Sequence, residues 1–126
     1  MNRSELIRMF VLDAIADDYE NLEQITKHIT RLSSDCGMAV TPSVVLQALD
    51  ELIAAGLAKA YRLSNQIEEI GGMPPPDEIG SPNESLTDDA YFWVTEDGRR
   101  LQLADCPAWP FDDNNTLRAD WRLPEN

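Results

Sequence analysis

The sequence has few basic residues. Ten Lys and Arg stand against 23 Asp and Glu, which gives a formal net charge of −13. Nucleic acids and membrane surfaces are anionic, and proteins bind them chiefly by placing Lys and Arg against phosphate groups. A net charge of this sign opposes both kinds of binding. We therefore predict no membrane binding, and nucleic acid is a disfavoured partner.

Cysteine and histidine are also scarce. The chain contains two cysteines, Cys36 and Cys106, and one histidine, His28. One histidine and two distant cysteines do not make a zinc site, so we predict no metal and no cofactor. No secretory signal precedes the cysteines, and we expect reduced thiols in a cytoplasmic protein. His28 follows Lys27 in the polar register of a helix, which is typical of a surface imidazole.

Long apolar runs and catalytic patterns are missing as well. No stretch approaches the 18 or so apolar residues that are needed to span a bilayer. A Cys36–His28 pair would require a loop to fold back onto a helix, and the adjacent acidic pairs lack the spacing of a calcium loop. We therefore predict that the chain is not an enzyme and has no catalytic, metal-binding or cofactor-binding residues.

The apolar residues that are present predict three helices in one domain. Hydrophobic residues make up 43% of the 126 residues, and they recur at helical spacing over about 4–17, 21–32 and 42–55. The residues expected to cap these helices at their N-termini are Ser4, Asn21 and Thr41. Gly56 is expected to end the third helix in a left-handed conformation.

Two strands are predicted after the helices. Leu57–Leu63 alternates loosely, and Tyr91–Val94 has the strongest strand signal in the chain, so a hairpin joining them is expected. Between them, residues 64–89 contain seven acidic residues, several prolines and no Lys or Arg. We expect this segment to be a long acidic loop. Thr95 is expected to cap a short fourth helical turn.

The order of three helices, a glycine stop and a hairpin resembles a winged helix-turn-helix. The run from Thr41 to Leu57, TPSVVLQALDELIAAGL, resembles the recognition helix and following strand of PadR-like and MarR-like transcriptional regulators. The run from Trp93 to Leu101, WVTEDGRRL, resembles their wing exit. The resemblance implies an α+β fold with a three-helix core, a two-stranded wing hairpin and a short fourth helical turn. In most relatives it also implies DNA binding by the third helix and the wing, often as a dimer.

We accordingly expect a winged-helix domain over 1–102, with 64–89 as its wing loop, and a Pro- and Trp-containing tail over 103–126. The aromatic residues of the tail indicate that it docks rather than remains solvated. It could pack on the apolar far side of the first helix, exchange within a homodimer, or capture another protein. The residues proposed for tail docking or self-association are Met9, Leu12, Ile15, Trp109, Phe111 and Trp121.

The predicted recognition surface departs from that of a DNA reader. Its residues are Ser43, Gln47, Asp50, Glu51 and Ala54, and no cation occurs between Pro42 and Leu57. Base-reading helices normally supply Arg, Lys, Asn or Gln to the major groove, and here two carboxylates would face the phosphates. The candidate phosphate contacts, if DNA is bound, are Lys27, Arg31, Arg99 and Arg100.

Two functional hypotheses follow. The first is a non-enzymatic winged-helix module for regulation or protein interaction, binding a protein partner or a second copy of itself, with weak or no intrinsic DNA binding. The alternative is a dimeric DNA-binding regulator of the PadR-like or MarR-like type. A small-molecule sensor would require a cavity, which sequence does not reveal.

Overall fold

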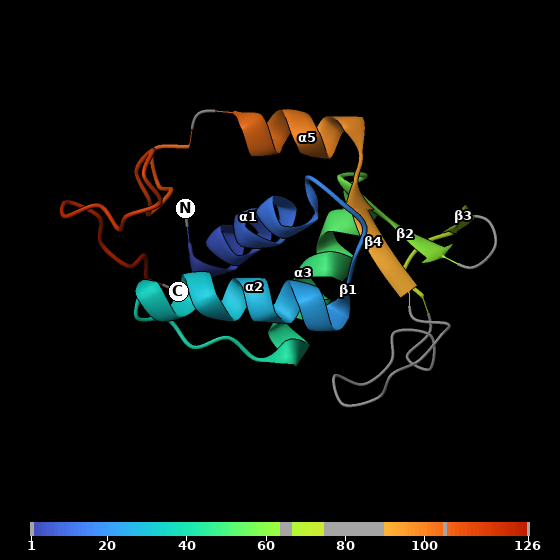
Figure 1. Cartoon of the computed structure of the whole chain (residues 1–126), viewed down its shortest axis with the longest axis horizontal. Helices are drawn as coiled ribbons and strands as arrows, with labels where there is room; N and C mark the ends of the chain where they lie inside the picture. Colours follow the sequence, from blue (N-terminus) through green and yellow to red (C-terminus); the bar gives the residue numbers. More distant parts are fainter. Residues whose placement is uncertain (1, 64–66, 75–89, 105, 126) are drawn as a thin grey trace.

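The computed structural model describes residues 2–63, 67–74, 90–104 and 106–125, and within them the fold is α+β. The described residues form four helices and one antiparallel sheet of four strands (Figure 1). The helices are α1 (Arg3–Ile15), α2 (Leu22–Asp35), α3 (Pro42–Ala54) and α5 (Glu96–Leu103). The strands are β1 (Glu20–Asn21), β2 (Ala58–Leu63), β3 (Ile67–Ile70) and β4 (Ala90–Val94).

Side-chain caps set where the helices begin. The Asn21 side chain accepts a hydrogen bond from Gln24 N at 2.9 Å, and the Gln24 side chain accepts one from Asn21 N, so α2 starts with a complete capping box. Thr41 caps α3 as predicted, with Pro42 at the first helical position. The cap predicted at Ser4 is wrong, because Asn2 accepts from Glu5 N and starts α1 earlier.

The sheet is larger than the predicted two-stranded hairpin. β2 and β4 do pair antiparallel, with Ala58 opposite Val94, but the full strand order is β1-β4-β2-β3. β1 lies where the sequence indicated only a break between helices, and it is too short to show any alternation. β3 lies inside the predicted wing loop, where its Ile-Glu-Glu-Ile composition hides it among acidic residues. Residues 64–66 and 75–89 of that predicted loop lie outside the described residues.

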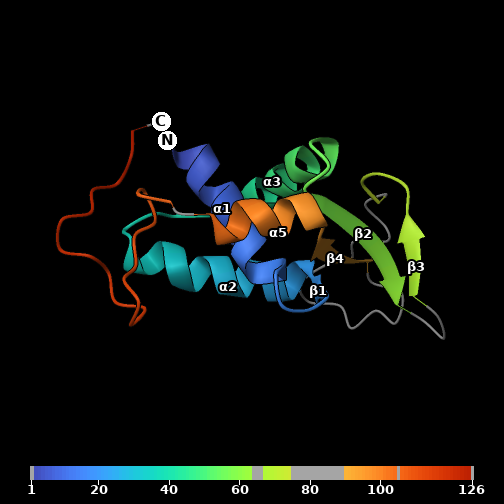
Figure 2. The same ribbon diagram turned by 90° about the horizontal axis from the view of Figure 1, so that it is seen from above.

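Helix α1 lies at the centre of the core. It contacts α2, α3, α5 and β4, and Figure 2 shows α5 crossing over it. This arrangement explains why α1 is apolar on nearly every side, since seven of its residues are buried. The largest side chains with almost no exposed surface include Phe10, Leu6, Leu12 and Ile15 from α1 and Phe92 from β4.

A tight turn joins α3 to the sheet and anchors α5. Gly56 has a φ of 76°, as expected for a left-handed cap, and Leu57 N donates to Leu52 O at 2.9 Å. Thr95 donates from Oγ1 to Gly56 O at 2.7 Å, which ties the start of α5 to this turn. Gly98 is buried against the same turn, and a Cβ there would overlap the carbonyl oxygen of Leu57.

The tail packs against its own chain at the end of the helical body opposite the sheet (Figure 1). The Trp109 ring meets Phe10 of α1 edge to face, with centroids 5.4 Å apart. Trp121 Nε1 donates to Ala108 O at 2.7 Å, and Arg3 Nε donates to Pro124 O at 2.9 Å. Of the arrangements expected for the tail, docking on the same chain is the one this structure contains.

Candidate functional site

The predicted recognition surface forms one outward face of α3. Ser43, Gln47, Asp50 and Ala54 are exposed, and Glu51 beside them is half-buried. Gln47 Nε2 donates to Glu51 Oε1 at 3.3 Å, and Glu51 is also ion-paired with Arg8 of α1. The cation that contacts this face is therefore already neutralised by a carboxylate of the same face. Asp50 has no hydrogen bond or ion pair with the described residues.

The four candidate phosphate contacts do not form one strip. Lys27 and Arg31 project from α2, whereas Arg99 and Arg100 belong to α5, and these two helices lie on different sides of α1 in Figure 1. Lys27 is 3.0 Å from Glu23, and Arg100 pairs with Glu96 and Asp97 of its own helix. Arg99 donates to the carbonyl of Ala16, where it caps the end of α1.

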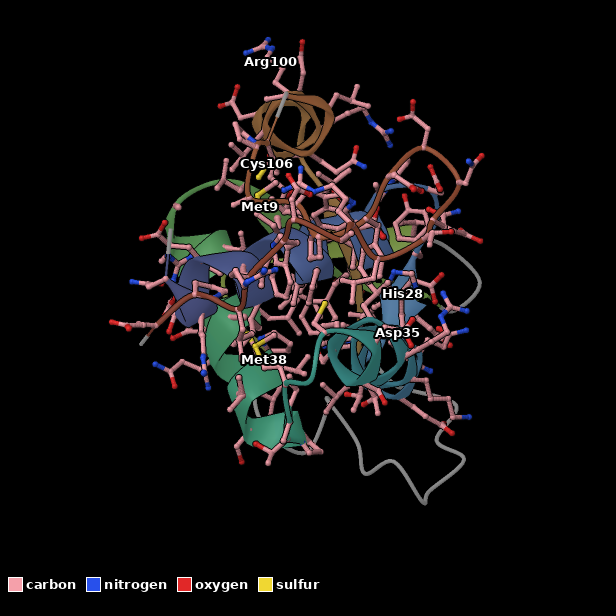
Figure 3. All side chains as sticks on the ribbon, turned by 90° about the vertical axis from the view of Figure 1, so that its left-hand side faces the viewer. Met9, His28, Asp35, Met38, Arg100 and Cys106 are labelled. Carbon is pink, nitrogen blue, oxygen red and sulfur yellow. The ribbon has the colours of Figure 1, made fainter. Side chains whose placement is uncertain are left out.

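The structure also contains a groove that the sequence did not reveal. It forms where the tail lies against α1 and α2, and it has a volume of about 920 Å³. Figure 3 views the tail from this end and labels Met9, His28, Asp35 and Cys106, four of the residues that line the groove. Its lining comes from separate parts of the chain, which is why no local motif indicated it. The principal side chains are Met9, Asp13, His28, Arg31, Asp35, Trp109, Phe111, Asp112, Asp113 and Arg118.

A hydrogen-bonded chain of three side chains forms one wall of the groove. His28 Nε2 lies 2.9 Å from Asp13 Oδ2, and Arg31 Nη2 lies 3.2 Å from His28 Nδ1. Because a guanidinium can only donate, Nδ1 is the acceptor, which places the proton of a neutral imidazole on Nε2 facing Asp13. The prediction of a simple surface imidazole is therefore wrong. His28 is half-buried and links α2 to α1.

The structure brings together only part of the predicted tail-docking set. Met9, Trp109 and Phe111 meet at the groove, and the two aromatic centroids are 6.1 Å apart. Leu12 and Ile15 lie inside the core with no exposed surface, so they are not available to a second copy in this conformation. Trp121 packs against the core at the edge of the tail, outside the groove lining.

The charged residues of the groove differ in whether they have partners. Asp112 accepts from Asn114 N at 2.9 Å and from Thr116 N at 3.0 Å, so it organises a turn of the tail. Arg118 donates to Pro107 O at 3.0 Å. The side chains of Asp35 and Asp113, by contrast, make no hydrogen bond or ion pair with any described residue. The lining has four carboxylates against the guanidiniums of Arg31 and Arg118, so the formal charge of the groove is negative.

The thiols and acidic side chains offer little other chemistry. Both cysteines are free, and burial raises the pKa of Cys36 to about 11, which keeps that thiol protonated at neutral pH. Within the described ranges, no group of three or more His, Cys, Asp or Glu side chains is placed to hold a metal ion. In the same ranges no helix combines the length and the apolarity that crossing a membrane requires.

No known family model, curated protein or solved structure matches the chain. The likeness to PadR-like and MarR-like regulators thus depends on the order of elements and on the two sequence runs that carry it.

Proposed function

We propose that the chain is a winged helix-turn-helix domain that serves as a non-enzymatic regulatory or protein-interaction module, with weak or no intrinsic DNA binding. The fold part of the proposal is supported by the order of α1, α2 and α3 followed by the antiparallel pair β2 and β4. In this interpretation β1 and β3 extend the wing sheet at its two edges. Fold alone does not decide what such a domain binds.

The observation that carries the proposal is the composition of the exposed α3 face. A recognition helix gains affinity from cations against phosphates and from donors against base edges. The exposed face of α3 offers Asp50 and no Lys or Arg, and Glu51 is engaged by Arg8. Entry into a DNA groove would bring these carboxylates close to phosphate oxygens, which is unfavourable at any salt concentration used for binding.

The cations elsewhere do not compensate for that face. Within the described residues, the basic side chains that form ion pairs are Arg8, Lys27, Lys59, Arg62, Arg100 and Arg118. Exposed ion pairs are weak individually, so they do not prevent a cation from changing partner. Their effect is that a phosphate contact made by one of these six side chains would bring a carboxylate of the protein close to the same phosphate, which reduces the gain from counterion release.

A second candidate function is a dimeric DNA-binding regulator of the PadR-like or MarR-like type. Two observations favour it: Gln47 and Ser43 are exposed on α3, and a glutamine side chain can pair with adenine. This candidate requires salt-dependent binding to duplex DNA. The same titration therefore separates the two functions.

The test is a fluorescence-anisotropy titration with mixed duplex DNA at about 50 mM salt, where phosphate contacts are strongest. We expect no saturable binding by the unmodified chain. The double variant Asp50→Lys/Ala54→Lys adds cations to the α3 face and should gain salt-dependent binding, by about tenfold or more over its control.

The matched control is Asp17→Lys/Ala119→Lys, which makes the same change in net charge at two exposed positions away from α3. It should bind duplex DNA no better than the unmodified chain. Micromolar binding by the unmodified chain that is lost on charge reversal of Lys27 and Arg31 would replace the proposed function with the DNA-binding regulator.

A further inference from the structure

We propose that the groove between the tail and helices α1 and α2 is the partner site of this module, and that it receives an arginine side chain of a partner polypeptide. The inference deepens the proposed function and rests on it. Its basis is the combination of an open groove, an aromatic wall and unpaired carboxylates on two different elements.

The groove has the dimensions of a binding site. Its volume of about 920 Å³ falls within the range found for ligand pockets. This space exceeds what one side chain fills, so an extended segment on each side of the arginine can enter with it. It is formed by the packed tail and two helices, not by a single exposed surface, so its walls are set before a ligand arrives.

Its apolar wall suits a guanidinium on a methylene stem. Met9, Trp109 and Phe111 line one part of the groove, and Trp109 is held in place by its edge-to-face contact with Phe10. A planar guanidinium stacks on aromatic rings and is more weakly hydrated than an ammonium group. The arginine stem can lie along the thioether of Met9 while its charged end remains near water.

Its charges favour a cationic ligand. The carboxylates of the lining, on Asp13, Asp35, Asp112 and Asp113, outnumber the guanidiniums of Arg31 and Arg118, which donate to His28 and to a backbone carbonyl. Asp35 on α2 and Asp113 on the tail have no such partner among the described residues, and carboxylates accept two hydrogen bonds from an arginine fork. The net charge of −13 also draws cations toward the protein and repels nucleic acid.

Internal hydrogen bonds keep these walls in position. The Asp13–His28–Arg31 chain joins α1 to α2, and the bond from Trp121 Nε1 to Ala108 O closes the tail on itself. A groove held in its binding geometry loses little conformational entropy when a ligand enters. Weak binding by a single arginine residue is therefore measurable, and flanking residues of a partner would add to it.

The test uses N-acetyl-arginine amide and its neutral isostere, N-acetyl-citrulline amide, titrated into the full chain labelled with ¹⁵N. We expect the arginine compound to shift the indole N–H resonance of Trp109 in a saturable way, with citrulline binding at least about fivefold more weakly. The corresponding lysine compound should bind less tightly than arginine because an ammonium group does not stack. Equal shifts by arginine and citrulline would overturn the proposal.

Two variants assign the response to the groove. Asp35→Asn and Asp113→Asn remove carboxylates that hold no other residue, so folding is expected to be unchanged, and a thermal melt verifies this. Each should weaken arginine binding about two- to fivefold, as expected for partly exposed charge pairs. Asp17→Asn removes an exposed carboxylate that does not line the groove and should leave the dissociation constant unchanged. Unchanged binding in both groove variants would refute the assignment.

Two further results distinguish a partner polypeptide from a small amine as the source of the cation. They also show whether the groove assignment or the proposed function fails. A peptide containing one arginine between glycines should bind at least as tightly as agmatine, and much tighter binding of agmatine would replace the partner polypeptide with a small amine. Absence of arginine binding, together with absence of duplex binding, would overturn the groove assignment and leave the proposed function standing. Duplex binding through α3 would instead overturn the proposed function on which this inference rests.

Discussion

The outward face of α3 and the tail-covered groove differ in what surrounds their polar residues. On α3, the Asp50 side chain is exposed and has no partner among the described residues. The neighbouring Glu51 is contacted by Gln47 of the same helix and by Arg8 of α1. In the groove, polar groups from α1 and α2 are linked in a hydrogen-bonded chain beside a wall of aromatic rings. In the proposed winged helix-turn-helix the α3 face would be the DNA-reading surface, whereas the groove combines an aromatic wall with unpaired carboxylates.

This difference shows that position in a fold and chemical suitability can be separated. A helix that enters DNA needs cations and base-reading donors on its exposed side. The exposed side of α3 has no Lys or Arg. The groove depends on a tail that follows the two sequence runs that carry the resemblance. The part of the chain with no counterpart in the resemblance is therefore where we place partner binding.

The largest expected effect concerns how firmly the tail is docked. Trp109→Ala removes a half-buried aromatic residue that packs on Phe10, and it should lower the free energy of unfolding by about 3 kcal/mol. Val44→Ala on the α3 face, where the side chain is 37% exposed, should change it by about 0.5 kcal/mol or less. Urea denaturation followed by circular dichroism measures both. Equal losses in the two variants would mean that the tail is not part of the folded unit.

The next prediction concerns α5, which leads from the sheet to the tail. In an exposed helix, replacing glycine by alanine stabilises by roughly 1 kcal/mol. Gly98→Ala should instead destabilise by about 2 kcal/mol, because the new Cβ would overlap the carbonyl oxygen of Leu57. Thermal unfolding of this variant shows whether the substitution lowers or raises the stability of the chain. A rise in melting temperature would contradict the close packing of α5 on the turn after α3.

A smaller effect is expected from the polar chain that links α1 to α2. A double-mutant cycle with Asp13→Asn and His28→Gln should give a coupling free energy of about 0.5–1 kcal/mol, since the pair is only partly exposed. A reference cycle between Asp50→Asn and Gln47→Ala on α3 should give none, because Gln47 donates to Glu51 and shares no hydrogen bond with Asp50. Similar coupling free energies in the two cycles would mean that the hydrogen bond between Asp13 and His28 contributes no specific coupling.

The smallest effect concerns pH. Burial, followed by the nearby charge of Asp18, raises the pKa of Glu20 at the edge strand β1. A carboxyl whose pKa is raised by folding favours the folded state below its unfolded pKa, and this contribution is lost as pH rises through the folded pKa. Glu20→Gln should therefore stabilise the chain at pH 7, by no more than about 0.5 kcal/mol after solvent screening. Urea titrations at pH 7 and below pH 4 should show the gain at neutral pH only.

The helices and the main strand pair could be predicted because their signals are local. The caps at Asn21 and Thr41, the left-handed Gly56 and the aromatic run of β4 each depend on residues a few positions apart. β1 escaped prediction because two residues cannot show a period, and its pairing with β4 spans most of the chain. The need for glycine at position 98 of α5 could not be predicted either, because it arises from a close contact with the distant Leu57.

The candidate sites differ in the same way. The α3 face could be predicted residue by residue, because helical spacing alone places Ser43, Gln47, Asp50 and Ala54 together. The groove could not, because its lining joins residues of α1 and α2 to residues 67 or more positions later, the shortest separation being from Asp35 to Gln102. The aromatic content of the tail indicated docking, but not that docking would enclose polar groups. His28 was predicted to be a surface residue because its partner Asp13 lies on α1 and comes within hydrogen-bond distance only when α1 and α2 pack.

The most direct test of the account is an NMR titration of the ¹⁵N-labelled chain with mixed duplex DNA at about 50 mM salt. The account predicts that the backbone amides of Ser43, Gln47 and Asp50 keep their chemical shifts throughout the titration. The same sample should respond at the Trp109 indole when an arginine peptide is added afterwards. Saturable shifts along α3 on addition of DNA would contradict the account.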